Sequence, residues 1–196
     1  MKSNDRMKVI LVDCDGVLMN WEYAFYVWME RHGYEPVKGS LAYDVGERFG
    51  LEKEEKNHLV KMFNESAAIG FLPPLRDAMY YVDLLHRKHG YVFHMITSLS
   101  LDPSAQSLRI QNTKKLFGET AFEKFVFCDT GADKDMALIP YRDSGYFWIE
   151  DKTENAVLGH QMGLESIIMK HGHNMNNDTG LPMVRDWSEI YEYITN

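Results

Sequence analysis

Short apolar runs alternate along this chain with longer segments in which apolar residues recur every three or four positions. The first run, residues 9–12, has no polar interruption, which is typical of a strand buried on both faces of a parallel sheet. Later runs predict four more strands, at residues 91–96, 125–128, 146–149 and 165–169. The periodic segments between them predict helices at residues 75–88, 104–117, 153–162 and 187–194. This alternation predicts an α/β fold, a Rossmann-like, doubly wound parallel sheet with helices on both faces.

Residues 20–72 interrupt the alternation and predict a small helical insert after the first strand. A helix over residues 20–32 has Asn20 as its N-cap and Gly33 as its stop. A second helical pattern covers residues 51–66, and glycine and proline residues then break it. We therefore expect one core, made of residues 1–19 and 73–196, and a separate helical unit over residues 20–72.

Composition and charge narrow the class of protein. The 196 residues carry a formal net charge of −8 and have no long basic run, which argues against a nucleic-acid polymer as partner. No apolar run reaches the length of a membrane span, and the first residues do not resemble a secretory signal. Cys14 and Cys128 lack metal-type spacing, so we expect free thiols in a reducing compartment, the cytoplasm.

Two aspartates directly after the first strand are the first candidates for chemistry. Asp13 and Asp15 are two positions apart, so on an extended backbone both side chains leave the strand end on the same side. Gly16 permits a sharp turn behind them. Two adjacent carboxylates repel each other unless a cation intervenes, and oxygen ligands of this kind suit Mg²⁺. The alternative is an ordinary strand-end turn that happens to be rich in Asp.

Polar groups also follow the later strands. Because ligands of such sheets bind beyond the carboxyl ends of the strands, we expect these groups to meet at one edge. The full set is Asp13, Asp15, Thr97, Ser98, Lys134, Glu150 and Asp151.

This set suits the hydrolysis of a phosphate monoester. Asp13 and Asp151, with a backbone carbonyl near Asp15, would hold Mg²⁺, so Asp13, Asp15 and Asp151 are the predicted metal site. Asp13 would attack phosphorus and form an aspartyl-phosphate. Asp15 would protonate the leaving oxygen and later deprotonate water.

The remaining groups would bind the phosphate. Lys134 would supply a positive charge, and Thr97 and Ser98 would supply hydroxyl donors. Lys152 competes with Lys134 for this role, and a Thr at a strand end is often only structural.

For several other residues, a purely structural role explains the sequence as simply as a functional one. Glu150 and its neighbour could cap a helix that begins near Thr153. Trp21 could belong to the core or lean over the site as a binding surface. His171 and His173 have the spacing of zinc ligands, but without a nearby Cys or third His we interpret them as loop residues.

Together these pieces resemble the haloacid-dehalogenase-like (HAD) phosphohydrolases over almost the whole chain. The first motif of that superfamily is matched by residues 12–18, Val-Asp-Cys-Asp-Gly-Val-Leu. Residues 95–98 match the second motif, Lys134 the third, and residues 148–151 followed by Asn155 the fourth. Asp15 is the residue that marks the phosphatase branch rather than the true dehalogenases.

Within the superfamily the chain looks most like the 5′(3′)-deoxyribonucleotidases. The shared features are an aromatic residue after the first motif, a Thr-Ser pair in the second, an Asp-Lys pair, and a His-Asn tail before a Trp-containing helix. Here these are Trp21, Thr97 and Ser98, Asp133 and Lys134, and His173, Asn174 and Trp187. The sequence departs from the family at Leu99, where a Pro is usual, and at Glu150, where an Asp is usual.

The resemblance implies a Mg²⁺-dependent phosphatase acting on a nucleoside monophosphate, with the deoxy form as the expected substrate and residues 20–72 as its cap. Trp21 and Ser98 would contact the substrate, and a homodimer is allowed. Two alternatives stay open: a phosphatase for another small phosphoester such as a sugar phosphate, and a phosphate-binding protein without catalysis.

Overall fold

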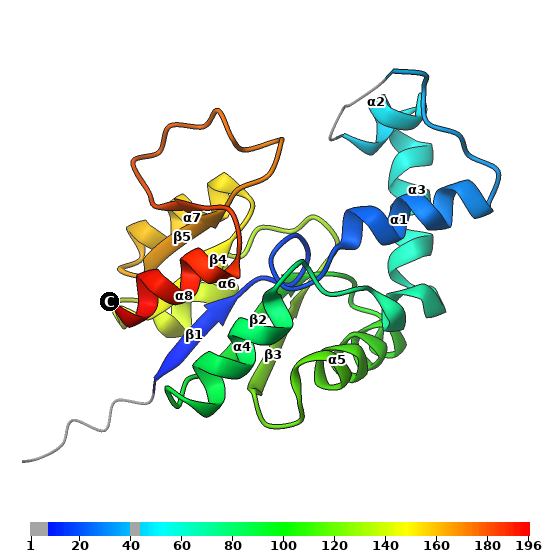
Figure 1. Ribbon diagram of the computed structural model, residues 1–196. Coiled ribbons are helices and arrows are strands. Elements are labelled where there is room, and N and C mark those ends of the chain that lie inside the picture. Colours follow the sequence, from blue (N-terminus) through cyan, green and yellow to red (C-terminus); the bar gives the residue numbers. More distant parts are fainter. Residues whose placement is uncertain (1–7, 40–43) are drawn as a thin grey trace, which may run out of the picture.

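The computed structural model describes residues 8–39 and 44–196. All strands lie in one parallel sheet with the order β3-β2-β1-β4-β5-β6 (Figure 1). The strands are β1 (Val9–Val12), β2 (Val92–Ser98), β3 (Phe122–Cys128), β4 (Phe147–Glu150), β5 (Glu165–Met169) and β6 (Met183–Val184). The predicted α/β, Rossmann-like, doubly wound sheet is confirmed.

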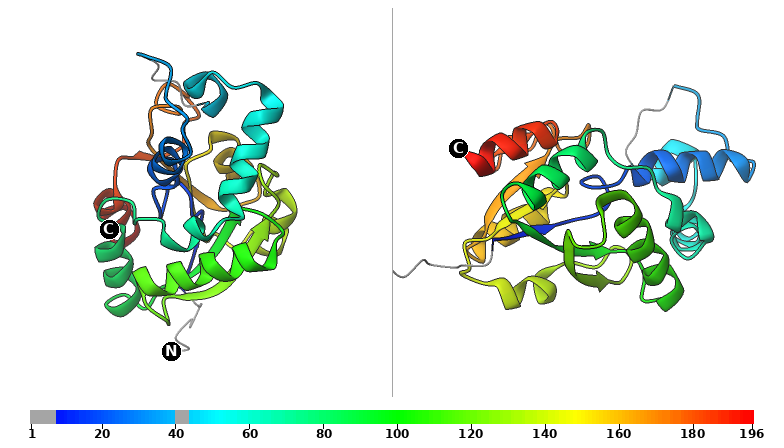
Figure 2. Two further views of the ribbon diagram at one scale, coloured as in Figure 1. Left: turned by 90° about the vertical axis from the view of Figure 1, so that its right-hand side faces the viewer. Right: turned by 60° about the horizontal axis from the view of Figure 1, so that its bottom comes forward.

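Helices cover both faces of the sheet. They are α1 (Trp21–Arg31), α2 (Val45–Phe49), α3 (Lys53–Asn64), α4 (Ala78–Arg87), α5 (Pro103–Phe117), α6 (Asp135–Leu138), α7 (Thr153–Gln161) and α8 (Trp187–Thr195), with short 3₁₀ turns η1 (Ala67–Phe71) and η2 (Ile139–Tyr141). Figure 2 shows α4 and α8 on one side of β1 and α6 on the other. Among the described residues, none of the helices combines the length and apolar character needed to cross a bilayer.

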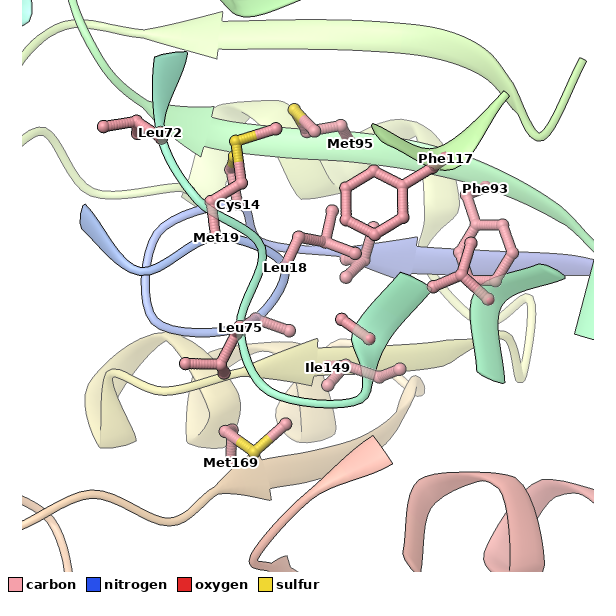
Figure 3. Close-up of a cluster of buried hydrophobic side chains, with 14 of the residues drawn as sticks. Cys14, Leu18, Met19, Leu72, Leu75, Phe93, Met95, Phe117, Ile149 and Met169 are labelled. Atoms are coloured by element: carbon pink, nitrogen blue, oxygen red, sulfur yellow. The ribbon is translucent and has the colours of Figure 1, made fainter. Parts of the chain in front are cut away.

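Strand β1 is the centre of the hydrophobic core because both of its faces are covered. Ile10 and Val12 pack into the larger cluster, which Phe93 and Ile149 join from the neighbouring strands (Figure 3). The alternate residues of β1 pack into a smaller cluster on the opposite face. All four residues of β1 are buried, as the unbroken apolar run predicts.

The helices α1, α2 and α3 stand beyond the carboxyl ends of the strands (Figure 1). An aromatic group joins α1 to α3: the Phe25 and Phe63 rings meet edge to face with centroids 5.2 Å apart. The N-cap predicted at Asn20 is confirmed, because its side chain accepts the backbone N–H of Tyr23. These helices thus cover the edge of the sheet at which the candidate catalytic residues lie.

Several boundaries differ from those that the sequence predicts. The pattern over residues 51–66 contains a helix that begins only at Lys53, with α2 before it. Strand β6 falls in a segment that we expected to be a loop, because two residues are too short to show a period. Thr97 and Ser98 lie within β2 rather than after it.

Candidate active site

The candidate site lies where the order of the strands reverses. β2 and β3 follow on one side of β1, and β4, β5 and β6 on the other. Strands β1 and β4 pair up to Val12 and Ile149, and the N–H of Asp13 donates to the carbonyl of Ile149 at 2.9 Å. The first residues beyond this pairing are therefore Asp13 and Glu150. In open α/β sheets, ligands bind at such a switch point.

A buried lysine connects the two strand ends. The Lys134 Nζ lies 2.7 Å from Asp13 Oδ1 and 2.8 Å from Glu150 Oε2, and only 2% of the lysine is exposed. Burial acts to lower the pKa of Lys134, but the Asp13 and Glu150 carboxylates outweigh it and raise that pKa above its usual value. By contrast, Lys152 is half exposed and lies 3.6 Å from Asp133. Of these two lysines, the structure brings Lys134 to Asp13.

Glu150 is an anchor for Lys134. Its Oε1 accepts the backbone N–H groups of Asp151 and Lys152, and its Oε2 accepts the Asn155 amide at 3.2 Å as well as the lysine. Glu150 is fully buried, and this set of donors satisfies its oxygens. The helix-capping role considered for the Glu-Asp pair is not found: the N-cap of α7 is Lys152, which makes no side-chain cap hydrogen bond, and the N–H groups that Glu150 accepts precede the helix.

The carboxylates exceed the positive charge at this point. Oxygens of Asp13, Glu150 and Asp151 lie within 4.8 Å of one another, and Lys134 is the cation that contacts two of them. Burial first, and the neighbouring carboxylates second, raise the pKa values of Asp13 and Asp151. When all three carboxylates are ionised, they and the one ammonium leave an excess of two negative charges, which a divalent cation would neutralise. The oxygen donors fit Mg²⁺.

Gly16 permits the close approach of Asp151 to the turn after β1. Its φ is +76°, a left-handed conformation, and a Cβ there would lie 2.3 Å from Asp151 Oδ2. An L-residue at this position would meet both a backbone penalty and a clash. The glycine of the first motif thus keeps Asp151 beside the turn that carries Asp13 and Asp15.

Asp15 is held from a helix that the sequence did not associate with the site. Arg109 of α5 contacts both of its carboxylate oxygens, with Nη1 2.5 Å from Oδ1 and Nη2 3.4 Å from Oδ2. The arginine is fully buried, whereas the Asp15 side chain is 24% exposed and lines the cavity. No motif identifies Arg109, since it is one polar residue within a predicted helix.

Thr97 and Ser98 have different surroundings at the end of β2. The Thr97 hydroxyl is buried, and its Oγ1 has no hydrogen-bond partner among the described residues. The Ser98 hydroxyl donates to the carbonyl of Ala132 at 2.9 Å, in the loop that leads to Lys134. Both residues line the cavity. The unused Thr97 hydroxyl is therefore available to a ligand, while that of Ser98 fixes the loop.

These groups form the floor of a cavity of about 710 Å³ between the sheet edge and the helices above it. Trp21 lines its wall, with the indole stacked on Phe25 at 4.8 Å and Nε1 donating to Asn64. The ring is therefore both part of the aromatic cluster and a cavity surface, which combines the two alternatives considered for it.

The tail histidines also line the cavity, which the sequence did not predict. His171 and His173 lie in the loop after β5, as expected, with parallel rings 5.7 Å apart. His171 Nε2 lies 2.6 Å from the Gly16 carbonyl oxygen, and His173 Nε2 lies 3.3 Å from that of Asp151. Burial lowers the pKa of both imidazoles, so they contact the motif loops in the neutral form.

The prediction of free thiols is confirmed for both cysteines, Cys14 and Cys128.

Comparison with known structures decides the fold. A haloacid dehalogenase-like hydrolase of Streptococcus pneumoniae superposes with a TM-score of 0.67 at 14% identity, covering 96% of this chain and 98% of that one. The fold is that of the HAD-like hydrolases. The HAD-hydrolase YfnB of Bacillus subtilis, bound to magnesium, gives 0.62 at 12% identity over 97% and 100% of the two chains. CbbY of Rhodobacter sphaeroides, in complex with phosphate, gives 0.60 at 15% identity over 94% and 96%.

Sequence comparison is less informative than structure. No family model matches the chain. An uncharacterized 32.4 kDa protein of Enterobacteria phage T4, from the Gp30-rIII intergenic region, is 26% identical over 132 residues. The match covers 64% of this chain and 46% of that protein, so the chain spans about half the length of this relative. The HAD-like fold and the acidic cluster are thus observations, whereas the substrate has to be argued from the site.

Proposed function

We propose that this chain is a Mg²⁺-dependent phosphatase that hydrolyses a nucleoside monophosphate, with a deoxyribonucleotide as the preferred substrate. The observation that carries the proposal is the contact of Asp13 with buried Lys134 beside Asp151, on the floor of a cavity that Asp15 also lines. This arrangement offers a nucleophile, an acid/base and a site for a cation within one cavity.

Asp13 is the proposed nucleophile. Its Oδ1 accepts both the Lys134 ammonium and the Cys14 backbone N–H, at 2.7 Å each, so its carboxylate is fixed in orientation. A carboxylate oxygen forms a bond to phosphorus while the ester bond to the leaving oxygen breaks, which gives an aspartyl-phosphate. The leaving oxygen takes a proton from Asp15 and departs as an alcohol.

The second step returns the enzyme to its starting state. Asp15 takes a proton from a water molecule whose oxygen attacks phosphorus, and the bond from phosphorus to Asp13 breaks. Inorganic phosphate leaves, and the Asp13 carboxylate is restored. Asp15 thus gives one proton and recovers one in each cycle.

Charge neutralisation and hydrogen bonding would hold the phosphate. Asp13 and Asp151, with the backbone carbonyl of Asp15, would hold Mg²⁺, which supplies positive charge beside the phosphate oxygens. Lys134 adds an ammonium, and the Thr97 hydroxyl, which has no partner among the described residues, is available to a phosphate oxygen. The magnesium of YfnB and the phosphate of CbbY, two proteins of this fold, support this set of ligands.

The cavity wall supports a base-bearing substrate. Its volume of about 710 Å³ lies within the range of roughly 300–1,000 Å³ of small-molecule sites. Trp21 offers a flat ring whose orientation is fixed by Phe25 and Asn64. A ring that is already ordered loses little entropy when a nucleobase packs against it. We propose that residues 20–72 act as a cap that encloses the nucleoside.

The test is phosphate release from a panel of deoxyribo- and ribonucleoside monophosphates and sugar phosphates, with Mg²⁺ and with EDTA. We expect release that depends on Mg²⁺, favours deoxyribonucleotides and is abolished in Asp13→Asn. Asp83→Asn, which changes a distant surface carboxylate that pairs with Arg87, is the control and should keep full activity. An Asp13→Asn enzyme with near wild-type turnover would contradict the nucleophile.

A sugar phosphatase is the second candidate, because the cavity wall also carries Glu22 and Lys56, which suit the hydroxyl groups of a sugar. Trp21→Ala separates the two candidates. For a nucleotidase it should raise KM for nucleotides with little change in kcat, whereas for a sugar phosphatase it should leave KM for the sugar phosphate unchanged. Phosphate binding without turnover would instead indicate a non-catalytic protein.

A further inference from the structure

Arg109 is a fully buried arginine at the back of the proposed catalytic site. It lies in the middle of α5, and its guanidinium faces the turn that follows β1, where it contacts the Cys14 sulfur and both oxygens of Asp15. Cys14 is a fully buried thiol, so it offers the arginine a neutral acceptor. Among the described contacts of Arg109, Asp15 therefore supplies the compensating charge.

A structural role alone explains this contact poorly. A buried guanidinium carries a large desolvation cost, and replacing a buried ion pair with apolar residues often leaves a protein equally stable. Here the carboxylate is the one that opens into the cavity, two residues after the proposed nucleophile. The site thus places a rigid, buried donor pair behind the group that exchanges protons with the substrate.

The geometry of the contact fixes an orientation as well as a charge. A guanidinium presents its N–H donors in a planar fork, and contact with both carboxylate oxygens restricts rotation about both side-chain bonds of an aspartate. Arg109 is itself anchored, because α5 is tied to the chain before α4: the amide of the neighbouring buried Asn112 donates to the Leu72 carbonyl at 3.0 Å. The position of α5 therefore sets the position of the Asp15 carboxyl group.

We propose that Arg109 is a positioning residue that holds Asp15 in the orientation in which it protonates the leaving oxygen. This inference rests on the proposed phosphatase function. It assigns to α5 a part in proton transfer, and it distinguishes Asp15 from Asp13, which is oriented by Lys134 and by the Cys14 N–H.

The test uses the dependence of the rate on the leaving group. The value of kcat/KM reports the steps up to formation of the aspartyl-phosphate, and a nitrophenolate leaves without protonation whereas the alkoxide of a nucleotide does not. Arg109→Lys keeps the charge but lacks the fork. We expect it to lower kcat/KM for a nucleoside 5′-monophosphate on the order of tenfold to a hundredfold, a part of the roughly 10²–10⁴-fold contribution of general acid–base catalysis, because Asp15 itself is retained. For p-nitrophenyl phosphate the loss should stay below about threefold.

Three further variants control for folding and for the route of the effect. Gln111→Ala removes an exposed hydrogen bond to Ser107 on the same helix, away from Asp15, and should leave the ratio of the two kcat/KM values unchanged. In an Asp15→Asn background, Arg109→Lys should add no further leaving-group-selective loss. Arg109→Gln, which removes the charge and keeps one amide donor, is measured in parallel and should show the same selectivity.

Each outcome decides the inference. An equal loss on both substrates, a gain in rate, or a failure of both Arg109 variants to fold would overturn it and leave Arg109 as a structural or restraining residue. If the wild-type protein turns over neither the nucleoside monophosphate nor p-nitrophenyl phosphate, the phosphatase function itself is refuted.

Discussion

Replacement of Lys134 by methionine tests whether the acidic cluster needs a cation. The change keeps an unbranched side chain of similar length but leaves Asp13 and Glu150 without the ammonium that contacts them at 2.7 and 2.8 Å. Removing one partner of a buried ion pair costs about 3–5 kcal/mol, because the other charge stays buried and unpaired. For a chain of this size we therefore expect Tm in EDTA to fall by roughly 6–20 °C.

Mg²⁺ should restore part of the thermal stability that Lys134→Met loses. Without Lys134, three carboxylates, two of them buried, lie within 4.8 Å of one another, so a divalent cation has more charge to neutralise than in the wild type. We expect Mg²⁺ to raise the Tm of Lys134→Met more than that of the wild type, because a ligand of the folded state stabilises it by mass action.

The assay is thermal unfolding followed by circular dichroism, in EDTA and over a series of Mg²⁺ concentrations. Lys152→Met is the matched control, because Lys152 is half exposed and its contact with Asp133 is 3.6 Å long. It should shift Tm by no more than about 4 °C, as for a surface ion pair of less than about 1 kcal/mol. A Lys134→Met protein as stable as the wild type in EDTA would refute the reasoning, since the cluster would then tolerate its own charge.

Three further predictions concern the same edge of the sheet. Gly16→Ala should lower phosphatase activity at least tenfold and weaken Mg²⁺ binding measured by calorimetry, because its Cβ would lie 2.3 Å from Asp151 Oδ2; an unchanged affinity would contradict this. In EDTA, the free energy of unfolding should fall as pH rises from the ordinary carboxyl pKa, about 3.9, through the raised folded-state pKa of Asp151, because the folded state binds the proton more tightly. Urea unfolding at several pH values should show this fall less steeply in Asp151→Asn; identical slopes would refute it. Trp187→Phe removes the Nε1 hydrogen bond to the Val17 carbonyl and part of a fully buried ring, which should cost about 1–3 kcal/mol in urea unfolding; a cost near zero would contradict the packing.

The sheet was predictable because its strands are short, apolar and separated by clear breaks. The run Val9–Val12 and the polar groups at the carboxyl ends of β1, β2 and β4 predicted a site at one edge of the sheet. Lys134 could be named from its position after β3, but its burial between Asp13 and Glu150 could not, because it depends on the register of separate strands.

Helix α5 shows a case in which hydrophobic periodicity does not reveal the buried face of a helix. Its buried positions include Arg109, Asn112 and Thr113, so much of the face that packs on the protein is polar. Reasoning from hydrophobic periodicity assigns polar residues to the solvent side. The polar face is satisfied by tertiary partners, Asp15 and Leu72 among them, and no local signal in the sequence reveals such partners.

The C-terminal end of α3 is the point at which the helices above the cavity are hydrogen-bonded to the segment after β2. Asn64 accepts from Trp21 and donates to the Leu99 carbonyl, and the neighbouring Glu65 accepts the Ser100 hydroxyl at 2.8 Å. Any motion that keeps these bonds must pivot at the C-terminal end of α3. With about 1.5 Å of rise per residue, the helix is a lever of about 18 Å. A tilt of about 10° at the pivot displaces the far end, at Lys53, by about 3 Å, roughly the diameter of a water molecule.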